Sequence, residues 1–343
     1  MKNVLFLLLF FPLIFLGQKK SKLLPLPKNT FLKIDNYAKK TPSSLTKDIE
    51  TLANHLIKKA KTDIDKARLI FIWLTENIYY DDRGYNSGKY NDCQANSVLR
   101  SRKSVCEGYA NLFLELGLEM GLNIKKVSGY SKGYGYIPGK PFLKTDHAWN
   151  LIKIGDEWRV FDATWGHGYG ENKGGRLKSV KKFNEYWFNV DPYEAIFNHF
   201  PDSDNSFVEP SISLKKYEKM PHIGSSFFTL GFDGKEIYSL ANSNTNIKFP
   251  ETYQVDTHIK FNDCPILKDL KINNSYQFEV YIPRGLKVAL ISKKGKNWKY
   301  FESDNGDFTL NYIPKYKGDI SISVQLENNN SFYETILIYN AIK

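Results

Sequence analysis

The sequence predicts an α+β domain over residues 46–200, followed by an all-β sandwich over residues 205–343. Three observations lead to this fold class. Apolar residues recur at helical spacing between residues 46 and 122, two β-prone runs flank a short turn between residues 146 and 165, and short alternating runs recur beyond about residue 201. With 343 residues, 42% hydrophobic and 25% charged, the chain is large and apolar enough to fold as two domains.

The N-terminal stretch has the pattern of a secretory signal peptide. Lys2 precedes an apolar run from Val4 to Leu16, and polar residues follow Gly17. This run is shorter than the roughly 20 apolar residues that a membrane-spanning helix needs. We expect residues 1–17 to be removed on export and residues 18–45 to form a linker. The mature chain would then have no transmembrane segment and would lie in the periplasm, on the cell surface or outside the cell.

The charge of the chain limits its partners only loosely. There are 48 Lys and Arg against 37 Asp and Glu, a formal net charge of +11, which favours anionic cell-envelope components or acidic proteins. The basic residues are scattered and no nucleic-acid reader motif is present, so we expect no nucleic-acid partner.

The first domain begins with two amphipathic helical patterns. The first has a single apolar stripe, formed by Ile49, Leu52, Ala53, Leu56 and Ala60. The second begins at a capping box, Thr62 with Asp65, and continues the helical period to Ile78. A polar loop over residues 81–96 follows. Residues 104–122 (SVCEGYANLFLELGLEMGL) are apolar on nearly every face, which predicts a helix buried on most sides.

Cys106, near the start of this buried helix, is in the position of a catalytic nucleophile. The chain has three cysteines, Cys93, Cys106 and Cys264, so at least one thiol stays unpaired within the chain. Unpaired N–H groups and the dipole at a helix N-terminus favour a thiolate and can also donate to an oxyanion. Thiol catalysis needs in addition an imidazole to take the proton and a third group to orient that imidazole.

Register arithmetic places His147 and Asp162 on one face of a β-hairpin. The two β-prone runs of residues 146–165 are separated by Gly155 and Asp156. If these two residues form the turn, Ile154 faces Glu157 and His147 becomes a diagonal neighbour of Asp162, with Cα atoms about 7–8 Å apart. A four-residue loop would preserve this arrangement, whereas an unbulged three-residue loop would separate the two side chains. We therefore predict a turn of even length.

The remaining histidines show no comparable setting, and we assign them no role; they are His55, His167, His199, His222 and His258. No Cys or His pair has the spacing of a zinc site. We expect neither a metal nor an organic cofactor.

Beyond about Pro201 the helical period disappears from the sequence. Runs such as Tyr276, Phe278, Val280 and Ile282 alternate with polar residues between turn dipeptides, so one face of each strand should be buried. We expect an immunoglobulin-like sandwich that serves as a structural or adhesive module and carries no catalytic residue.

Three segments, SVCEGYANLF, TDHAWNLI and EWRVFDATWG, resemble the motif blocks of the transglutaminase-like superfamily, most of all its kyphoscoliosis-peptidase-like subgroup. With the Tyr80-Asp81 pair upstream, the resemblance covers about residues 46–187. It implies a papain-like core in which Cys106 is the nucleophile, His147 the general base and acid, and Asp162 the residue that orients His147.

Such a triad predicts a thiol acyl-transfer enzyme that acts on a protein or peptide substrate. Cys106 would attack a peptide or glutamine amide, and water or an amine would resolve the thioester, giving a protease or amidase in one case and a protein crosslinker in the other. The family also includes scaffolds that have lost the triad. The alternative is therefore a non-catalytic cell-envelope binding or assembly protein, whose function Cys106→Ala would leave intact.

Overall fold

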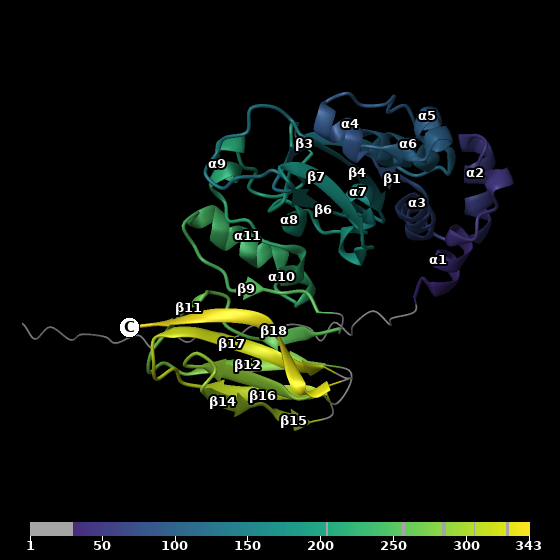
Figure 1. The fold of residues 1–343 in the computed structure, drawn as a ribbon. Helices are drawn as coiled ribbons and strands as arrows, with labels where there is room; N and C mark the ends of the chain where they lie inside the picture. The colour runs from purple at the N-terminus through teal and green to yellow at the C-terminus, as the bar shows by residue number, and fades with distance from the viewer. Residues whose placement is uncertain (1–29, 204, 256–257, 283–285, 305, 327–328) are drawn as a thin grey trace, which may run out of the picture. The chain divides into compact units, whose positions relative to one another are not determined.

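A computed structural model describes residues 30–343, apart from residues 204, 256–257, 283–285, 305 and 327–328 (Figure 1). The predicted signal peptide, residues 1–17, and part of the predicted linker lie outside the described residues. Within the described residues, none of the helices combines the length and the apolar character needed to cross a membrane.

The N-terminal helices are α1 (Leu32–Lys39), η1 (Ser43–Leu45), α2 (Ile49–Leu56), η2 (Ile57–Lys59) and α3 (Asp63–Asn77). The capping box between Thr62 and Asp65 is present at the start of α3, as predicted. The predicted linker over residues 18–45 differs from the structure, because its second half forms α1 and η1.

A buried arginine holds α1 against the rest of the domain. Arg68 of α3 is 2% exposed and donates to both carboxylate oxygens of Asp35 in α1 at 2.7 Å. It also donates to Glu185 at 2.5 and 2.9 Å. These partners lie 33 and 117 residues away in sequence, so the contacts that hold α1 could not be predicted from the local sequence.

The long helix α6 (Cys106–Glu119) begins directly after a short parallel pair of strands, β1 (Tyr79–Tyr80) and β2 (Lys103–Ser104). Helices α4 (Asp82–Ser87) and α5 (Ala95–Ser101) precede α6. The predicted loop over residues 81–96 is thus partly helical. Asp81 caps α4 and Gly88, at φ +65°, ends it.

Four antiparallel strands form the sheet against which α6 packs, in the order β5-β4-β3-β8. They are β3 (Ile124–Ser131), β4 (His147–Ile154), β5 (Glu157–Phe161) and β8 (His199–Pro201). Ile154 pairs with Glu157, which confirms the two-residue turn and its even length.

Short elements complete this domain: α7 (Ala163–His167), the hairpin of β6 (Gly168–Lys173) and β7 (Arg176–Lys181), η3 (Glu185–Trp187) and α8 (Pro192–Ala195). Helix α7 packs closely on α3. A Cβ atom at Gly166 would come within 2.3 Å of Cζ of Phe71, so any other residue would force the ring or the helix to shift.

The prediction that the chain is all-β beyond about residue 201 is wrong for residues 214–243. This segment forms α9 (Leu214–Lys219), α10 (Ser225–Thr229) and α11 (Gly234–Ser243). Asp233, which we interpreted as part of a turn, caps α11 by accepting from the N–H of Glu236 at 2.9 Å. Lys132, 2% exposed, donates from Nζ to two carbonyl oxygens at the end of α9, those of Tyr217 (2.9 Å) and Met220 (2.8 Å).

The rest of the C-terminal region is β-rich, as predicted, and contains two sheets (Figure 1). One has the order β10-β12-β16-β15, formed by Lys260–Asp263, Tyr276–Tyr281, Asp307–Tyr312 and Glu302–Asp304. The other has the order β11-β18-β17-β13-β14, with β9 beside β18; these strands are Asp269–Lys271, Asn329–Ile342, Gly318–Leu326, Val288–Ser292, Asn297–Tyr300 and Glu251–Thr252.

Side chains from both sheets share one hydrophobic cluster, to which Phe278, Val280 and Ile322 belong. The predicted burial of one face of β12 is confirmed, since Phe278 and Val280 are fully buried. The immunoglobulin-like classification stays a prediction.

Candidate active site

Cys106 is the first residue of α6 and is half-buried. Val105 precedes it in an extended conformation, and among the described residues no side chain caps this helix end. The helix lies very close to the preceding strand at this point, because a Cβ atom at Gly108 would come within 2.0 Å of Oγ of Ser104. The thiol therefore sits beside first-turn N–H groups that no capping side chain occupies.

The hairpin brings His147 and Asp162 together as the register predicted. Nε2 of His147, the first residue of β4, lies 2.7 Å from Oδ2 of Asp162, which directly follows β5. Both side chains are buried, with 8% and 1% exposed. A buried pair at this distance is a charge-assisted hydrogen bond when the imidazole is protonated.

Asp162 accepts four hydrogen bonds. Oδ1 caps α7 and accepts the N–H groups of Thr164 (2.9 Å) and Trp165 (3.0 Å). Oδ2 accepts from His147 and also from His199, at 2.9 Å. Burial acts to raise the pKa of this carboxyl, but His147 and, less strongly, His199 hold it well below its usual range. Asp162 is therefore a buried carboxylate anion.

His147 connects the carboxylate to the thiol. Burial acts to lower the pKa of its imidazole, yet the charge and hydrogen bond of Asp162, followed by the effect of the neighbouring Cys106 thiol, raise that pKa above its ordinary value. The three residues predicted from the sequence thus meet in space, in the order Cys106, His147, Asp162. This arrangement can pass the thiol proton to a fixed imidazole.

His199 is part of this cluster, although nothing in the sequence indicated it. It begins β8, is 2% exposed, and has its pKa lowered to about 4 by burial, against the opposing effect of Asp162. It reaches the site because β8 pairs with β3, where His199 lies opposite Ser131. That pairing joins segments 68 residues apart in the chain, so no local pattern could reveal it.

Three tryptophans surround the two imidazoles. The ring centroids of Trp149, Trp165 and Trp187 lie 4.9, 4.5 and 4.8 Å from that of His199. Trp149 and Trp165 also lie 5.9 and 5.3 Å from His147. These indoles keep water away from the carboxylate and strengthen its interactions with the imidazoles.

Donor atoms of His147, Asp162 and His199 lie within 4.8 Å of one another, a set of side chains that can bind a metal. Both nitrogen–oxygen distances, however, are hydrogen-bond lengths of 2.7 and 2.9 Å. A tetrahedral zinc ion holds such ligands about 2.0–2.2 Å away and hence about 3.3 Å apart. The geometry favours two hydrogen bonds over a metal site.

The other histidines lie elsewhere in the fold. His55 interacts with Tyr37, His167 contacts the carbonyl oxygen of Thr75 through Nδ1 at 2.8 Å, and His258 is exposed. None of the three cysteines forms a disulfide. Burial raises the pKa of the Cys93 thiol, which accepts a 3.6 Å hydrogen bond from Ser104.

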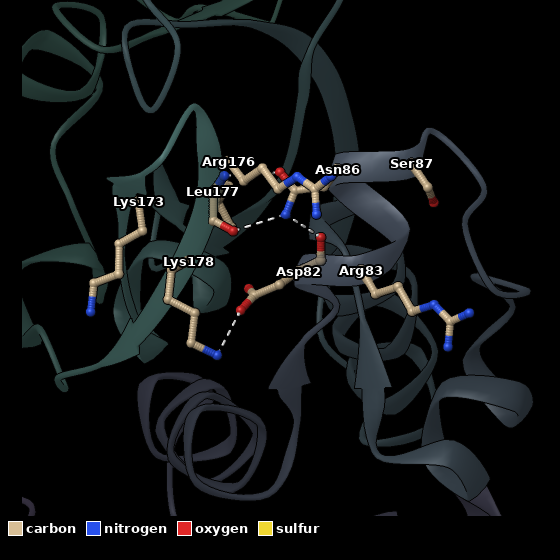
Figure 2. Close-up of a pocket in the computed structure, with 8 residues that line it drawn as sticks. All are labelled: Asp82, Arg83, Asn86, Ser87, Lys173, Arg176, Leu177 and Lys178. Atoms are coloured by element: carbon tan, nitrogen blue, oxygen red, sulfur yellow. Dashed lines mark hydrogen bonds and ion pairs between the residues drawn. The ribbon is translucent and has the colours of Figure 1, made fainter.

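A cavity of about 570 Å³ lies between α4 and the β6–β7 hairpin (Figure 2). Its lining carries four basic side chains and one acidic side chain, from Arg83, Lys173, Arg176, Lys178 and Asp82, together with Asn86, Ser87 and Leu177. Asn86 fixes one wall by bonding to both the N–H (2.9 Å) and the carbonyl oxygen (2.8 Å) of Leu177. None of the three triad residues lines this cavity.

Residues 50–163 match the family model of the transglutaminase-like superfamily. These residues form a transglutaminase-like domain. The matched span includes Cys106, His147 and Asp162 and ends one residue after the last of them. His199 lies outside it.

Parts of the chain are similar to known proteins. Kyphoscoliosis peptidase from Homo sapiens is 32% identical over 212 residues, which are 61% of this chain and 32% of that protein. Cytokinesis protein 3 from Schizosaccharomyces pombe is 26% identical over 179 residues, 52% of this chain and 20% of that protein. A crystal structure of a TGase has 18% identity and a TM-score of 0.25, covering 42% of this chain and 35% of that chain. The chain thus spans about a third or less of the length of these curated relatives.

Proposed function

We propose that the chain is a thiol acyl-transfer enzyme acting on protein or peptide amides. The observation that carries this proposal is the buried hydrogen bond between His147 and Asp162, together with the contact of His147 with Cys106. A carboxylate anion that fixes an imidazole beside a thiol, so that the thiol proton can pass to the imidazole, is the arrangement that thiol nucleophiles need.

In the first half-reaction Cys106 acts as the nucleophile. The thiol proton passes to His147 before the substrate is attacked, which gives a thiolate beside an imidazolium. The sulfur then attacks the amide carbonyl carbon, which places a negative charge on the carbonyl oxygen. As the tetrahedral intermediate collapses, the C–N bond breaks and His147 gives its proton to the departing nitrogen. An amine or ammonia leaves, and the acyl group stays on Cys106 as a thioester.

The second half-reaction restores the thiol. Water or an amine attacks the thioester, His147 takes a proton from the attacking group, and the proton returns to sulfur as the C–S bond breaks. Water makes the protein a protease or an amidase, whereas a lysine amine makes it a crosslinking transglutaminase.

The N-terminus of α6 supports the negative charge of the intermediate. Its first turn begins at Cys106 itself, no side chain in the described part of the chain caps its N–H groups, and the helix dipole has its positive end there. Removing a donor of this kind costs enzymes about 10²–10³ in rate.

A second candidate function is a binding or assembly role in which the domain presents a groove and catalyses nothing. The observation in its favour is the likeness to cytokinesis protein 3, whose name describes no reaction. The intact set of Cys106, His147 and Asp162 favours the enzyme instead.

The test uses the full mature chain with a mixture of glutamine-containing peptides, with and without a fluorescent primary amine. New peptide N-termini report proteolysis, released ammonia reports deamidation, and peptide fluorescence reports transamidation. We expect one of these signals from the wild type, none from Cys106→Ala, and wild-type signal from the matched control Cys264→Ala. A signal that survives in Cys106→Ala would contradict the proposal, and no signal from any variant would favour the binding role.

We further propose that the chain is exported, on the basis of the signal-like pattern of residues 1–17, and that its net charge of +11 suits an anionic cell envelope. Cell fractionation followed by N-terminal sequencing tests this. A new N-terminus near residue 18 in the exported fraction is expected, and a chain that keeps Met1 in the cytosol would contradict it.

A further inference from the structure

We propose that His199 is a positioning residue of the active site: its neutral imidazole donates a hydrogen bond to Asp162 and keeps that carboxylate ionised and oriented toward His147. This inference rests on the proposed function, because it assigns a role within the same thiol site. It adds a residue that lies outside the matched family span of residues 50–163.

One carboxylate oxygen serves both imidazoles. Oδ2 of Asp162 lies 2.7 Å from Nε2 of His147 and 2.9 Å from Nε2 of His199, and the two rings are 5.2 Å apart at their centroids. A carboxylate can only accept hydrogen bonds, so each Nε2 carries a proton. The shared oxygen thus fixes the tautomer of both rings.

The positive charge belongs to His147. Its imidazole has two partners that favour the charged form, Asp162 and Cys106. His199 has Asp162 alone, and within the described residues its buried Nδ1 has no hydrogen-bond partner. A second imidazolium would place two cations beside one carboxylate in a site surrounded by tryptophan rings, where the low dielectric makes the second charge unfavourable. His199 is therefore neutral, protonated on Nε2 and bare on Nδ1.

This hydrogen bond limits what Asp162 can do. Oδ1 is occupied by two backbone N–H groups of α7, and Oδ2 by two imidazole N–H groups. With every strong acceptor direction occupied, the carboxylate neither rotates nor takes the proton of His147 readily. The proton stays on His147, where the departing nitrogen of the substrate needs it.

His199 is itself held firmly. It pairs with Ser131 across β8 and β3, and the N–H of Lys132 donates to the carbonyl oxygen of Asn198 at 3.0 Å. The side chain of Asn198 in turn donates to the carbonyl oxygen of Ile223 at 2.8 Å. A donor fixed on both sides by backbone pairing can orient Asp162.

The competing explanation is packing, in which the ring of His199 only fills the space among Trp149, Trp165 and Trp187. Two substitutions separate the explanations. His199→Phe keeps an aromatic ring among the tryptophans but removes the donor. His199→Gln loses the ring but places an amide N–H near the position of Nε2.

The readout is the rate of Cys106 alkylation by iodoacetamide as a function of pH, which needs no substrate. The titratable groups that act on Asp162 and His199 are His147 and Tyr109, and Cys106 acts on His147. Losing the donor destabilises the Asp162 anion, so in His199→Phe the acid limb of the profile should move to higher pH by about one unit. At a fixed pH within the acid limb, alkylation of Cys106 would then be about tenfold slower than in the wild type. His199→Gln should keep the wild-type limb.

The opposite pattern, a wild-type profile in His199→Phe and a displaced one in His199→Gln, would overturn the inference in favour of packing. A wild-type Cys106 that is not activated at all would contradict the proposed function instead. If either variant fails to fold, ¹⁵N NMR of the imidazoles in the wild-type chain decides the matter. We expect His199 to be the neutral Nε2–H tautomer at pH 7, and a doubly protonated or Nδ1–H form would refute the inference.

Discussion

Asp162→Asn tests the electrostatics of the site with a single nearly isosteric change. Asparagine has one acceptor oxygen, and we expect it to keep capping α7 through the N–H groups of Thr164 and Trp165. The amide NH₂ then faces the N–H groups of His147 and His199, where the carboxylate oxygen had been. Both imidazoles lose their acceptor, and His147 loses its counterion.

The size of the expected fall in the pKa of His147 follows from the burial of its pair with Asp162. His147 and Asp162 are 8% and 1% exposed, so water cannot replace the lost anion. Removing one partner of a buried ion pair costs about 3–5 kcal/mol. At 1.36 kcal/mol per unit, the pKa of His147 should fall by about 2–4 units. Against the lowering effect of burial, Asp162 and Cys106 raise the pKa of His147 to about 10 in the wild type, so the pKa in Asp162→Asn should lie at about 6–8.

The assay is an NMR titration of ¹⁵N-histidine-labelled protein between pH 5 and 10. His147 should be an imidazolium at pH 7 in the wild type, and its pKa should be about 2–4 units lower in Asp162→Asn. The matched control is Asp146→Asn, which removes a neighbouring carboxylate that accepts the N–H of Ser131 at 2.8 Å and does not hydrogen-bond His147. This variant should shift the titration of His147 by less than one unit. If His147 titrates at the same pH with and without the carboxylate at position 162, the reasoning is refuted.

Three further predictions concern stability. Burial lowers the pKa of Lys132 from 10.5 to about 7. Between pH 7 and pH 10.5 the unfolded chain therefore binds a proton that the folded chain does not, so the free energy of unfolding should rise with pH in this range. Urea unfolding at pH 7 and pH 9 measures this change in the free energy of unfolding, and Lys132→Met should reduce it. The same change in both proteins would contradict the prediction. Arg68→Met removes a buried cation from two carboxylates and should lower the free energy of unfolding by about 2–4 kcal/mol in the same assay, whereas a loss below 0.5 kcal/mol would show that α1 does not depend on it. Gly166→Ala forces a methyl group against Phe71 and should cost about 1–3 kcal/mol, visible as a lower melting temperature; an unchanged one would mean that α7 moves freely.

The triad was predictable because each of its residues is marked by local sequence. Cys106 precedes a long apolar helix, and the alternation of the hairpin fixes the faces of His147 and Asp162 once the turn length is known. Because side chains alternate between the two faces of a strand, this prediction depends only on whether the turn length is even or odd, and an error in the strand ends does not change it.

The parts that sequence reasoning missed depend on contacts distant in the chain. His199 joins the site through the pairing of β8 with β3, and α1 is held by Arg68, 33 residues from Asp35. Helices α9 and α10 have 6 and 5 residues, too short for a clear period, whereas the spacing of Ile237, Leu240 and Ala241 in the 10-residue α11 was a helical signal that we did not use. Their capping residues, such as Asp233, also occur in turns, so the same letters supported a wrong interpretation.

The central claim is that His147 activates Cys106, and iodoacetamide labelling of the full mature chain from pH 5 to 9 tests it most directly. Peptide mapping separates Cys106 from Cys93, whose thiol pKa is raised by burial, and from Cys264. We predict that Cys106 reacts fastest well below pH 8.5, the ordinary value for a thiol, and that His147→Ala removes this advantage. A Cys106 that reacts no faster than Cys264, or equally fast without His147, would contradict the account.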